Sequence, residues 1–306
     1  MKKSHTVIRA LASLLFLLVL TTVAQAQPTR RWVSGTGNDA NPCTFNSPCR
    51  TFAAAIAQTA AGGEINVKNP GVFGAVTIDK SITIDGGGTF AGLTASGVAA
   101  VRIDDAASPA PDTAVVTLRN LSINGAGPIP GTLGVDFVSE KTLNIENCQI
   151  SNFSYAGARI QVDGGNLNLK NTSIFSANAG VLVDVFPGSA PVSLNGCNLE
   201  QNTVAGLNVL AGGYVSIRDS VIQFNGSGVL LQAPGSTVNI MGSQVNHNTT
   251  GLDLGSLTTA TIGSSTFLDN STNFFNTNAG SLIRTFGNNQ TSTNPIPGAV
   301  TNLGLR

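Results

Sequence analysis

Charged and aromatic residues are both scarce in this chain of 306 residues. Charged residues make up 10% and aromatic residues 6% of the sequence, with one Trp and two Tyr, and the formal net charge is zero. A neutral chain has no general attraction to nucleic acid or to an anionic membrane. Because 42% of the residues are hydrophobic, the chain can fill a core, which argues against disorder.

Histidine is rarer still, since only His5 and His247 occur. This count leaves too few ligands for a tetrahedral zinc site. His247 lies in the segment QVNHNTTG, with no second His for a metal site or a proton relay. We interpret it as an exposed histidine in a turn rather than as a catalytic residue.

Only one long apolar run occurs, and it lies near the start of the chain. Lys2 and Lys3 precede apolar residues 10–23, and Ala24-Gln25-Ala26 follows them. This order is typical of a secretory signal peptide with its cleavage site. The alternative is a membrane anchor, but a spanning helix needs about 20 apolar residues. We therefore expect an exported protein, periplasmic or extracellular, that does not span a membrane after cleavage.

The rest of the sequence repeats one pattern. Two apolar residues separated by one other residue recur, with intervals of 27, 24, 25, 23, 23 and 22 residues between successive copies. The copies begin at Val116, Leu143, Leu167, Val192, Val215, Val238 and Ala260.

Each unit continues with an apolar residue, usually an Asn, then a Gly and a second alternating strand. The Asn residues are Asn178, Asn202, Asn225, Asn248 and Asn270, and the Gly residues are Gly134, Gly157, Gly180, Gly206, Gly228 and Gly251. Stacked Asn amides can hydrogen-bond to one another along a column. Gly would give the bend its backbone freedom. We therefore predict a structural role for these Asn residues.

Alternation with a period of two predicts strands with one buried face. The segments between strands are too short for crossover helices, so successive strands cannot lie side by side in one flat parallel sheet. Each unit must wind once around a common axis and stack on the next at about 4.8 Å. The predicted fold is all-β, a parallel β-helix built as a single-stranded solenoid.

The four cysteines fall into two pairs with different predicted states. Cys43 and Cys49 bracket the short polar loop CTFNSPC, and in an oxidising compartment they should form a disulfide. Cys148 and Cys197 occupy the same place in their units, with Thr172 between them. Two coils correspond to about 9.6 Å, beyond the bridging limit of about 7 Å. We therefore predict two free, buried thiols.

Both ends of a repeat array need a cover. The segment SPCRTFAAAIAQTAAGG predicts a short amphipathic capping helix, with Phe52 and Ile56 on its apolar side and Gly62-Gly63 at its end. The predicted division is a signal peptide (1–26), an N-terminal cap with the disulfide loop and helix (27–63), a parallel β-helix (64–283) and a C-terminal cap or tail (284–306).

Residues 32 to 290 carry a resemblance to a known fold family. The opening RWVSGTGNDANPCTFNSPCRTFAAAIAQTAAGGEINVKNPGVFGAVTIDKSITIDG and the later strands GVLVDV, GLNVL and GVLLQ resemble the pectin-lyase-like superfamily of right-handed β-helix proteins. Within it, the chain is most similar to exported bacterial β-helix repeat proteins of no assigned activity. The resemblance implies a right-handed parallel β-helix and says less about activity, because one fold carries many functions.

The resemblance does not extend to the catalytic motifs of the superfamily. Polygalacturonase-like enzymes place acids and a His just before the column Gly, in the forms NTDG, DD and GHG. The matching positions here are Leu133, Ala156, Ala179, Ala205, Ser227 and Thr250. None of these side chains serves as a general acid or base near neutral pH. An Asp cluster on adjacent repeat coils, which pectate-lyase-like enzymes use for calcium, is not evident either.

The best candidate site lies on the outward face of the second strand of each unit, the strand that comes after the Gly. Asp136 and Arg159 should be neighbours on successive coils, with Asp184 two coils beyond Asp136 as a third catalytic candidate. Gln161 and Asp163 follow on the same face as ligand-binding candidates. The simpler interpretation is a cross-strand ion pair on a solvated sheet.

Two acidic groups in the early coils leave room for a loosely bound calcium ion. Asp104-Asp105 lies in an Ala/Pro-rich loop, and Asp79 and Asp85 flank the strand Ile82-Thr83-Ile84. The sequence lacks the EF-hand and nonapeptide calcium motifs. We expect no metal site of another kind and no organic cofactor.

Three functions remain open. The first, which the bland site columns favour, is an exported non-catalytic scaffold that binds a surface, a matrix, a polysaccharide or another envelope component. The second is a polysaccharide lyase or hydrolase with an atypical site. The third is a passenger or adhesin module within an assembly. No nucleic-acid partner is expected.

Overall fold

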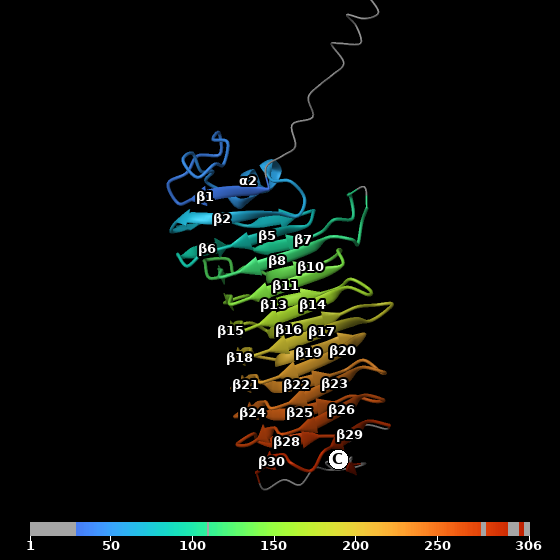
Figure 1. Ribbon diagram of the computed structural model, residues 1–306. Helices are drawn as coiled ribbons and strands as arrows, with labels where there is room; N and C mark the ends of the chain where they lie inside the picture. The colour runs from blue at the N-terminus through green and yellow to red at the C-terminus, as the bar shows by residue number, and fades with distance from the viewer. Residues whose placement is uncertain (1–28, 109, 277–279, 293–299, 303–306) are drawn as a thin grey trace, which may run out of the picture.

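The chain forms a column of stacked strands, and the one helix among the described residues lies near the N-terminal end of the column (Figure 1). The computed structural model describes residues 29–108, 110–276, 280–292 and 300–302. The predicted signal peptide, residues 1–26, lies outside the described residues. The fold is a right-handed parallel β-helix, which confirms the predicted fold class.

Three parallel sheets form the walls of the column. Sheet A contains β1 (Arg30–Ser34), β2 (Gly63–Asn69), β5 (Ile82–Asp85), β8 (Val115–Arg119), β11 (Thr142–Glu146), β14 (Asn166–Lys170), β17 (Ala190–Asn195), β20 (Gly213–Arg218), β23 (Thr237–Met241), β26 (Thr259–Gly263), β29 (Leu282–Thr285) and β31 (Val300–Asn302). Sheet B contains β3 (Gly71–Val72), β6 (Ala91–Thr94), β9 (Ser122–Asn124), β12 (Gln149–Ser151), β15 (Ser173–Phe175), β18 (Asn198–Glu200), β21 (Val221–Gln223), β24 (Gln244–Asn246), β27 (Thr266–Phe267) and β30 (Gln290–Thr291). Sheet C contains β4 (Val76–Ile78), β7 (Val101–Ile103), β10 (Leu133–Phe137), β13 (Ala156–Ile160), β16 (Ala179–Asp184), β19 (Ala205–Ala211), β22 (Ser227–Leu231), β25 (Thr250–Leu254) and β28 (Thr272–Phe275).

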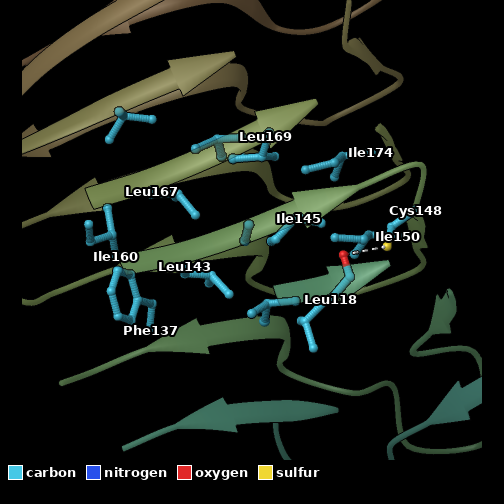
Figure 2. Close-up of a cluster of buried hydrophobic side chains, with 14 of the residues drawn as sticks. Leu118, Phe137, Leu143, Ile145, Cys148, Ile150, Ile160, Leu167, Leu169 and Ile174 are labelled. Atoms are coloured by element: carbon cyan, nitrogen blue, oxygen red, sulfur yellow. Dashed lines mark hydrogen bonds between the residues drawn. The ribbon is translucent and has the colours of Figure 1, made fainter. Parts of the chain in front are cut away.

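The register of the sheets is the one that the repeat predicts. Leu143 pairs with Val116 on one side and Leu167 on the other, and the apolar pairs continue down sheet A in the same way. Leu, Ile and Val from all three walls fill the interior, where most are fully buried (Figure 2). The alternation therefore determines which side of each strand faces the core.

Four of the five predicted Asn residues form a buried ladder in the turn between sheets B and C. The Nδ2 groups of Asn202 and Asn225 each donate to the Oδ1 of the next Asn at 3.0 Å, and Asn248 donates to Asn270 at 3.1 Å. Asn178 was wrongly included. Its ladder position is taken by Ala177, whose main-chain N–H donates to Asn202 Oδ1 at 3.1 Å.

The glycines before the inward strand residues of sheet C are required for space, not for backbone freedom as the sequence suggested. None of the six has a positive φ angle. A Cβ on Gly157 would lie 2.2 Å from Ile174 Cγ2 and 2.8 Å from the carbonyl oxygen of Gly180. Coils stacked this closely leave no room for a side chain at the bend.

Cys148, Thr172 and Cys197 occupy one column, as predicted, and both cysteines are free and buried. Cys148 Sγ donates a hydrogen bond to the carbonyl oxygen of Leu118 at 3.5 Å (Figure 2). Further down, the column continues as Ser220, Ser243 and Ser265, each of which accepts a main-chain N–H from the coil above. Small polar side chains thus complete hydrogen bonds at a turn that the strands cannot close themselves.

The first coils carry the helix α2 (Phe52–Gln58) and the disulfide Cys43–Cys49, both as predicted. Thr51 caps the helix by accepting the N–H of Ala54. The helix ends at Gln58, earlier than predicted, because its C-cap Thr59 is extended and Gly63 already begins β2. Phe52 and Ile56 are buried beneath it, so the helix covers the N-terminal end of the core.

Candidate functional site

The predicted pair Asp136 and Arg159 meets on the outer face of sheet C. The two residues are register partners on β10 and β13. Val135 and Phe137, on either side of Asp136, are fully buried in the core. Because side chains alternate along a strand, Asp136 projects away from the core toward the outer face.

Two arginines hold Asp136, one from each neighbouring coil. Arg159 Nε and Nη2 both lie 2.9 Å from Asp136 Oδ1. Arg102 Nη1 donates to Asp136 Oδ2 at 3.0 Å. The Asp136 side chain is 4% exposed, against 18% for Arg159 and 43% for Arg102. The carboxylate is therefore enclosed, while the two guanidinium groups keep contact with solvent.

Arg102 is a residue that the sequence reasoning misses. It lies on β7, in an early coil where the repeat is too irregular to align. The signal was nevertheless present, since Val101-Arg102-Ile103 alternates like the other strands. Arg102 Nη2 also donates to Asp104 Oδ2 at 2.7 Å. Burial alone would raise the pKa of Asp104, but the hydrogen bonds from Arg102 and from the Ala106 N–H outweigh it and lower that pKa.

The other three predicted residues lie apart from this Arg102–Asp136–Arg159 triad. The register shifts between Val183 and Asp184, and Asp184 Oδ2 accepts a hydrogen bond from Gln161 Nε2 at 3.4 Å. Asp163 lies in the loop after β13, where its Oδ1 accepts the main-chain N–H of Ser189 at 2.9 Å. Asp184 and Gln161 form one contact, and Asp163 holds a loop.

Beside the triad, the positions before the column glycines form an apolar strip. Leu133, Ala156 and Ala179 are register partners on successive strands. They pack with Leu182 as a small buried cluster outside the main core. The side chains of this strip offer no group that can transfer a proton.

The same face is shallow rather than deeply hollowed. A hollow of about 240 Å³ lies next to Arg102 and is lined by Ala75, Val76, Thr77, Val98 and Ala99. Tyr155 is 40% exposed, and the Arg159 guanidinium lies 5.9 Å from its ring centroid. Further along, Gln232 Nε2 donates to Asn208 Oδ1 at 3.0 Å. Arginine, amide and aromatic groups therefore share this surface.

His247 is an exposed turn residue, as the sequence indicated. Its side chain is 49% exposed and lies 3.6 Å from Asp269, and its ring packs beside Phe224 with centroids 5.1 Å apart. In the parts of the chain that the structure describes, no three His, Cys, Asp or Glu side chains converge as a metal site. No helix in the same parts is long and apolar enough to cross a membrane.

The comparisons with known proteins agree with this architecture. Residues 64–219 match the family described as "Right handed beta helix region", and the chain belongs to this family. The crystal structure of pectate lyase Pel9A is similar over 91% of this chain and 78% of the lyase, with a TM-score of 0.61 and 16% identity. The predicted resemblance to the pectin-lyase-like superfamily is therefore confirmed for the fold.

A second solved structure is similar over a smaller share of its length. The full-length tailspike protein 2 of Escherichia coli O157:H7 bacteriophage CAB120 matches 82% of this chain and 40% of its own, with a TM-score of 0.51 and 13% identity. A search of curated protein sequences found no significant match. At these identities the likeness shows the fold alone.

Proposed function

We propose that this chain is an exported β-helix scaffold that binds polysaccharide on the outer face of sheet C without cleaving it. The observation that carries the proposal is the state of Asp136. Both of its oxygens are bonded to arginines, and the side chain is 4% exposed. A general base or a calcium ligand needs a carboxylate oxygen that is not already bonded to a cationic group, and both oxygens of Asp136 are bonded to arginines.

The bonds that occupy Asp136 also hold the two arginines in place for a ligand. A carboxylate fixed between two guanidinium groups limits their rotamers, so less side-chain entropy is lost when a ligand binds. The side chains of Arg102 and Arg159 both keep some exposure to solvent, 43% and 18%. Guanidinium groups recognise carboxylates in a planar, two-bonded way, which suits an acidic sugar.

The remaining groups on the face suit a carbohydrate as well. Tyr155 offers an exposed ring beside Arg159, and aromatic rings with a polar end are common in binding surfaces. Gln232 offers an exposed amide, held by its hydrogen bond to the buried Asn208, and an amide can both donate and accept hydrogen bonds. The Cys43–Cys49 disulfide supports export, because disulfides persist in oxidising compartments.

The alternative function is a polysaccharide lyase or hydrolase with an atypical site. The likeness to pectate lyase Pel9A favours it, and Arg159 is the group that would act, since part of its guanidinium is accessible. Against it stands the apolar strip of Leu133, Ala156 and Ala179, which offers no partner for acid–base chemistry.

One experiment separates the two functions. The purified mature chain is incubated with pectin, polygalacturonate, alginate and hyaluronan, with calcium or with chelator, and product size is followed by chromatography. Binding to the same polymers is followed by affinity electrophoresis. We expect intact polymers, together with retention on at least one acidic polymer that weakens as salt is added.

The matched variants are Arg159→Ala, which removes one arm of the triad, and Arg218→Ala, which removes an exposed arginine from sheet A. Retention should fall in Arg159→Ala and persist in Arg218→Ala. Cleavage of a polymer by the unmodified chain, but not by Arg159→Ala, would refute the scaffold function and support the enzyme. Equal retention of both variants would move the binding surface away from sheet C.

A further inference from the structure

A group of acidic residues collects where the first three strands of sheet C end. Asp79 follows β4, Asp104 and Asp105 follow β7, and Glu140 lies just beyond β10. These strands are parallel neighbours in the sheet. Their ends therefore stack above one another, and the acids of three coils are brought to one edge of the column.

Glu140 is the unusual member of this group. Its exposure is 0%, and neither Oε1 nor Oε2 has a hydrogen-bond partner. Asp105 is 1% exposed, and its Oδ2 is also without a partner. Within the described part of the chain, neither residue takes part in an ion pair. Three buried carboxylate oxygens without partners are costly, since even one such group destabilises a fold by about 1–3 kcal/mol.

The polypeptide around these oxygens is nevertheless well fixed. Ser139 Oγ donates to Asp105 Oδ1 at 2.8 Å and accepts the Asp105 N–H at 2.7 Å. Asp105 Oδ1 also accepts the N–H of Asp112 at 3.1 Å, and Asp112 Oδ1 accepts the N–H of Glu140 at 3.4 Å. The loop between β7 and β8 is thus tied to the turn after β10. Asp105 Oδ1 is committed to this network, and Oδ2 has no hydrogen-bond partner.

Negative charge dominates the surroundings of the Glu140 carboxylate. Burial first, and then the charges of Asp105, Asp79 and Asp104, together raise the pKa of Glu140 to about 9. Arg102 is bonded to Asp104 and Asp136 instead. A buried carboxylate in such a field is neutralised either by a proton or by a cation.

We propose that Glu140 and Asp105 bind one calcium ion at this edge of the column. Calcium takes six to eight oxygen ligands and accepts carboxylates singly or in pairs, together with water and main-chain carbonyls. Two carboxylates are therefore a workable protein contribution, although no set of three acidic, His or Cys side chains converges among the described residues. Magnesium demands a near-ideal octahedron, which an irregular turn is less suited to supply.

This site differs from the binding face in both place and role. The triad lies on the outer face of β7, β10 and β13, whereas Glu140 and Asp105 are buried in the connections that follow the strands. Calcium here would neutralise the unpartnered carboxylate oxygens and hold Asp105 and Asp112 against the turn at Glu140. The inference does not depend on polysaccharide binding.

The experiment uses the full mature chain, first freed of metal with chelator and then titrated with calcium chloride. Isothermal titration calorimetry gives stoichiometry and affinity, and circular dichroism gives the thermal unfolding midpoint with and without calcium. We expect one site with a dissociation constant of about 10⁻⁴ to 10⁻³ M, the range of extracellular calcium modules, and a midpoint that rises with calcium concentration.

Three variants test the assignment. Glu140→Gln and Asp105→Asn keep the shape of each side chain and remove its charge, and each should weaken calcium affinity by at least about tenfold. Asp219→Asn removes an exposed acid from the turn after β20 and should leave the affinity unchanged. Glu140→Gln replaces an unpaired buried carboxylate with a neutral amide, so this variant should fold without calcium. A loss of calcium binding in it would therefore not result from unfolding.

The competing outcome is neutralisation by a proton alone. In that case calcium would change neither the heat nor the midpoint of the unmodified chain, and Glu140→Gln would raise the midpoint equally with and without calcium. That result would overturn the calcium site, as would calcium binding of equal strength in all three variants.

Discussion

The buried asparagine ladder allows the sharpest prediction about stability, at Asn225 in the middle of the column. Asn225 Nδ2 donates to Asn248 Oδ1 and to the carbonyl oxygen of Leu199, each at 3.0 Å. Its Oδ1 accepts two hydrogen bonds from Asn202, one from the main-chain N–H and one from Nδ2, also at 3.0 Å. Asn225→Ala therefore removes four hydrogen bonds from a residue that is 4% exposed.

The cost follows from the groups that the variant leaves behind. The main-chain N–H and the Nδ2 of Asn202 lose their main acceptor, and the Leu199 carbonyl loses a donor. Each buried group without a partner costs about 1–3 kcal/mol. Water can enter part of the space, so we expect Asn225→Ala to lower the free energy of unfolding by about 3–5 kcal/mol. With a urea dependence of about 3 kcal/mol per M for a chain of this size, the midpoint should fall by roughly 1–1.7 M.

Asn178→Ala is the matched control. Asn178 lies one residue beyond the ladder position and is only half-buried. Its loss should change the free energy of unfolding by less than about 0.5 kcal/mol. Urea unfolding followed by circular dichroism measures both variants. If Asn225→Ala and Asn178→Ala shifted the midpoint equally, the ladder would be a consequence of the fold and not one of its supports.

Two further predictions concern the core. Burial raises the pKa of the Cys148 thiol to about 12 and also raises that of Cys197, so neither forms much thiolate at pH 8. Iodoacetamide followed by mass spectrometry should leave both unmodified in the folded chain and label both in urea, and labelling in the folded state would show that the core opens. Gly157→Ala should destabilise the chain by about 1–3 kcal/mol through overpacking against Ile174 and the Gly180 carbonyl. Gly127→Ala, whose Cβ would meet nothing closer than 3.7 Å, should unfold like the unmodified chain in the same urea assay.

Most of the fold could be predicted because the repeat is written into the sequence. A period of two fixes which side of a strand is buried, and a period of 22 to 27 residues fixes which strands stack. The placement of Cys148, Thr172 and Cys197 in one column follows from the same counting. The N-terminal helix was predicted with a late end, because Gly62-Gly63 looks like a helix stop while the chain had already turned at Thr59.

Errors arose where counting along the chain could not register a local offset. Asn178 is one residue late in its unit, so Ala177 takes the ladder position. The column glycines looked like conformational hinges, but their φ angles are ordinary and the space beside them is filled. Only the distance between stacked coils distinguishes a glycine needed for freedom from one needed for room.

The candidate site could be predicted only in part. The pairing of Asp136 with Arg159 follows from the repeat. Arg102, which completes the triad, lies in a coil whose length departs from the others. Glu140 could not be predicted either, since nothing in the sequence around it indicates that the residue is fully buried. Residues from irregular coils are brought to the regular ones only by the winding of the chain.

The sequence by itself determined the architecture, namely a parallel β-helix with a capping helix, one disulfide, two free thiols and a ladder of Asn. These features depend on periodicity and spacing, which a solenoid preserves because each coil contacts only its neighbours. Only the tertiary structure decided the electrostatics. The occupation of both Asp136 oxygens and the isolation of those of Glu140 depend on burial and on contacts about 30 residues apart in the chain. The free-energy cost of a charge depends on how deeply it is buried, and the burial of a single residue cannot be read from the linear sequence.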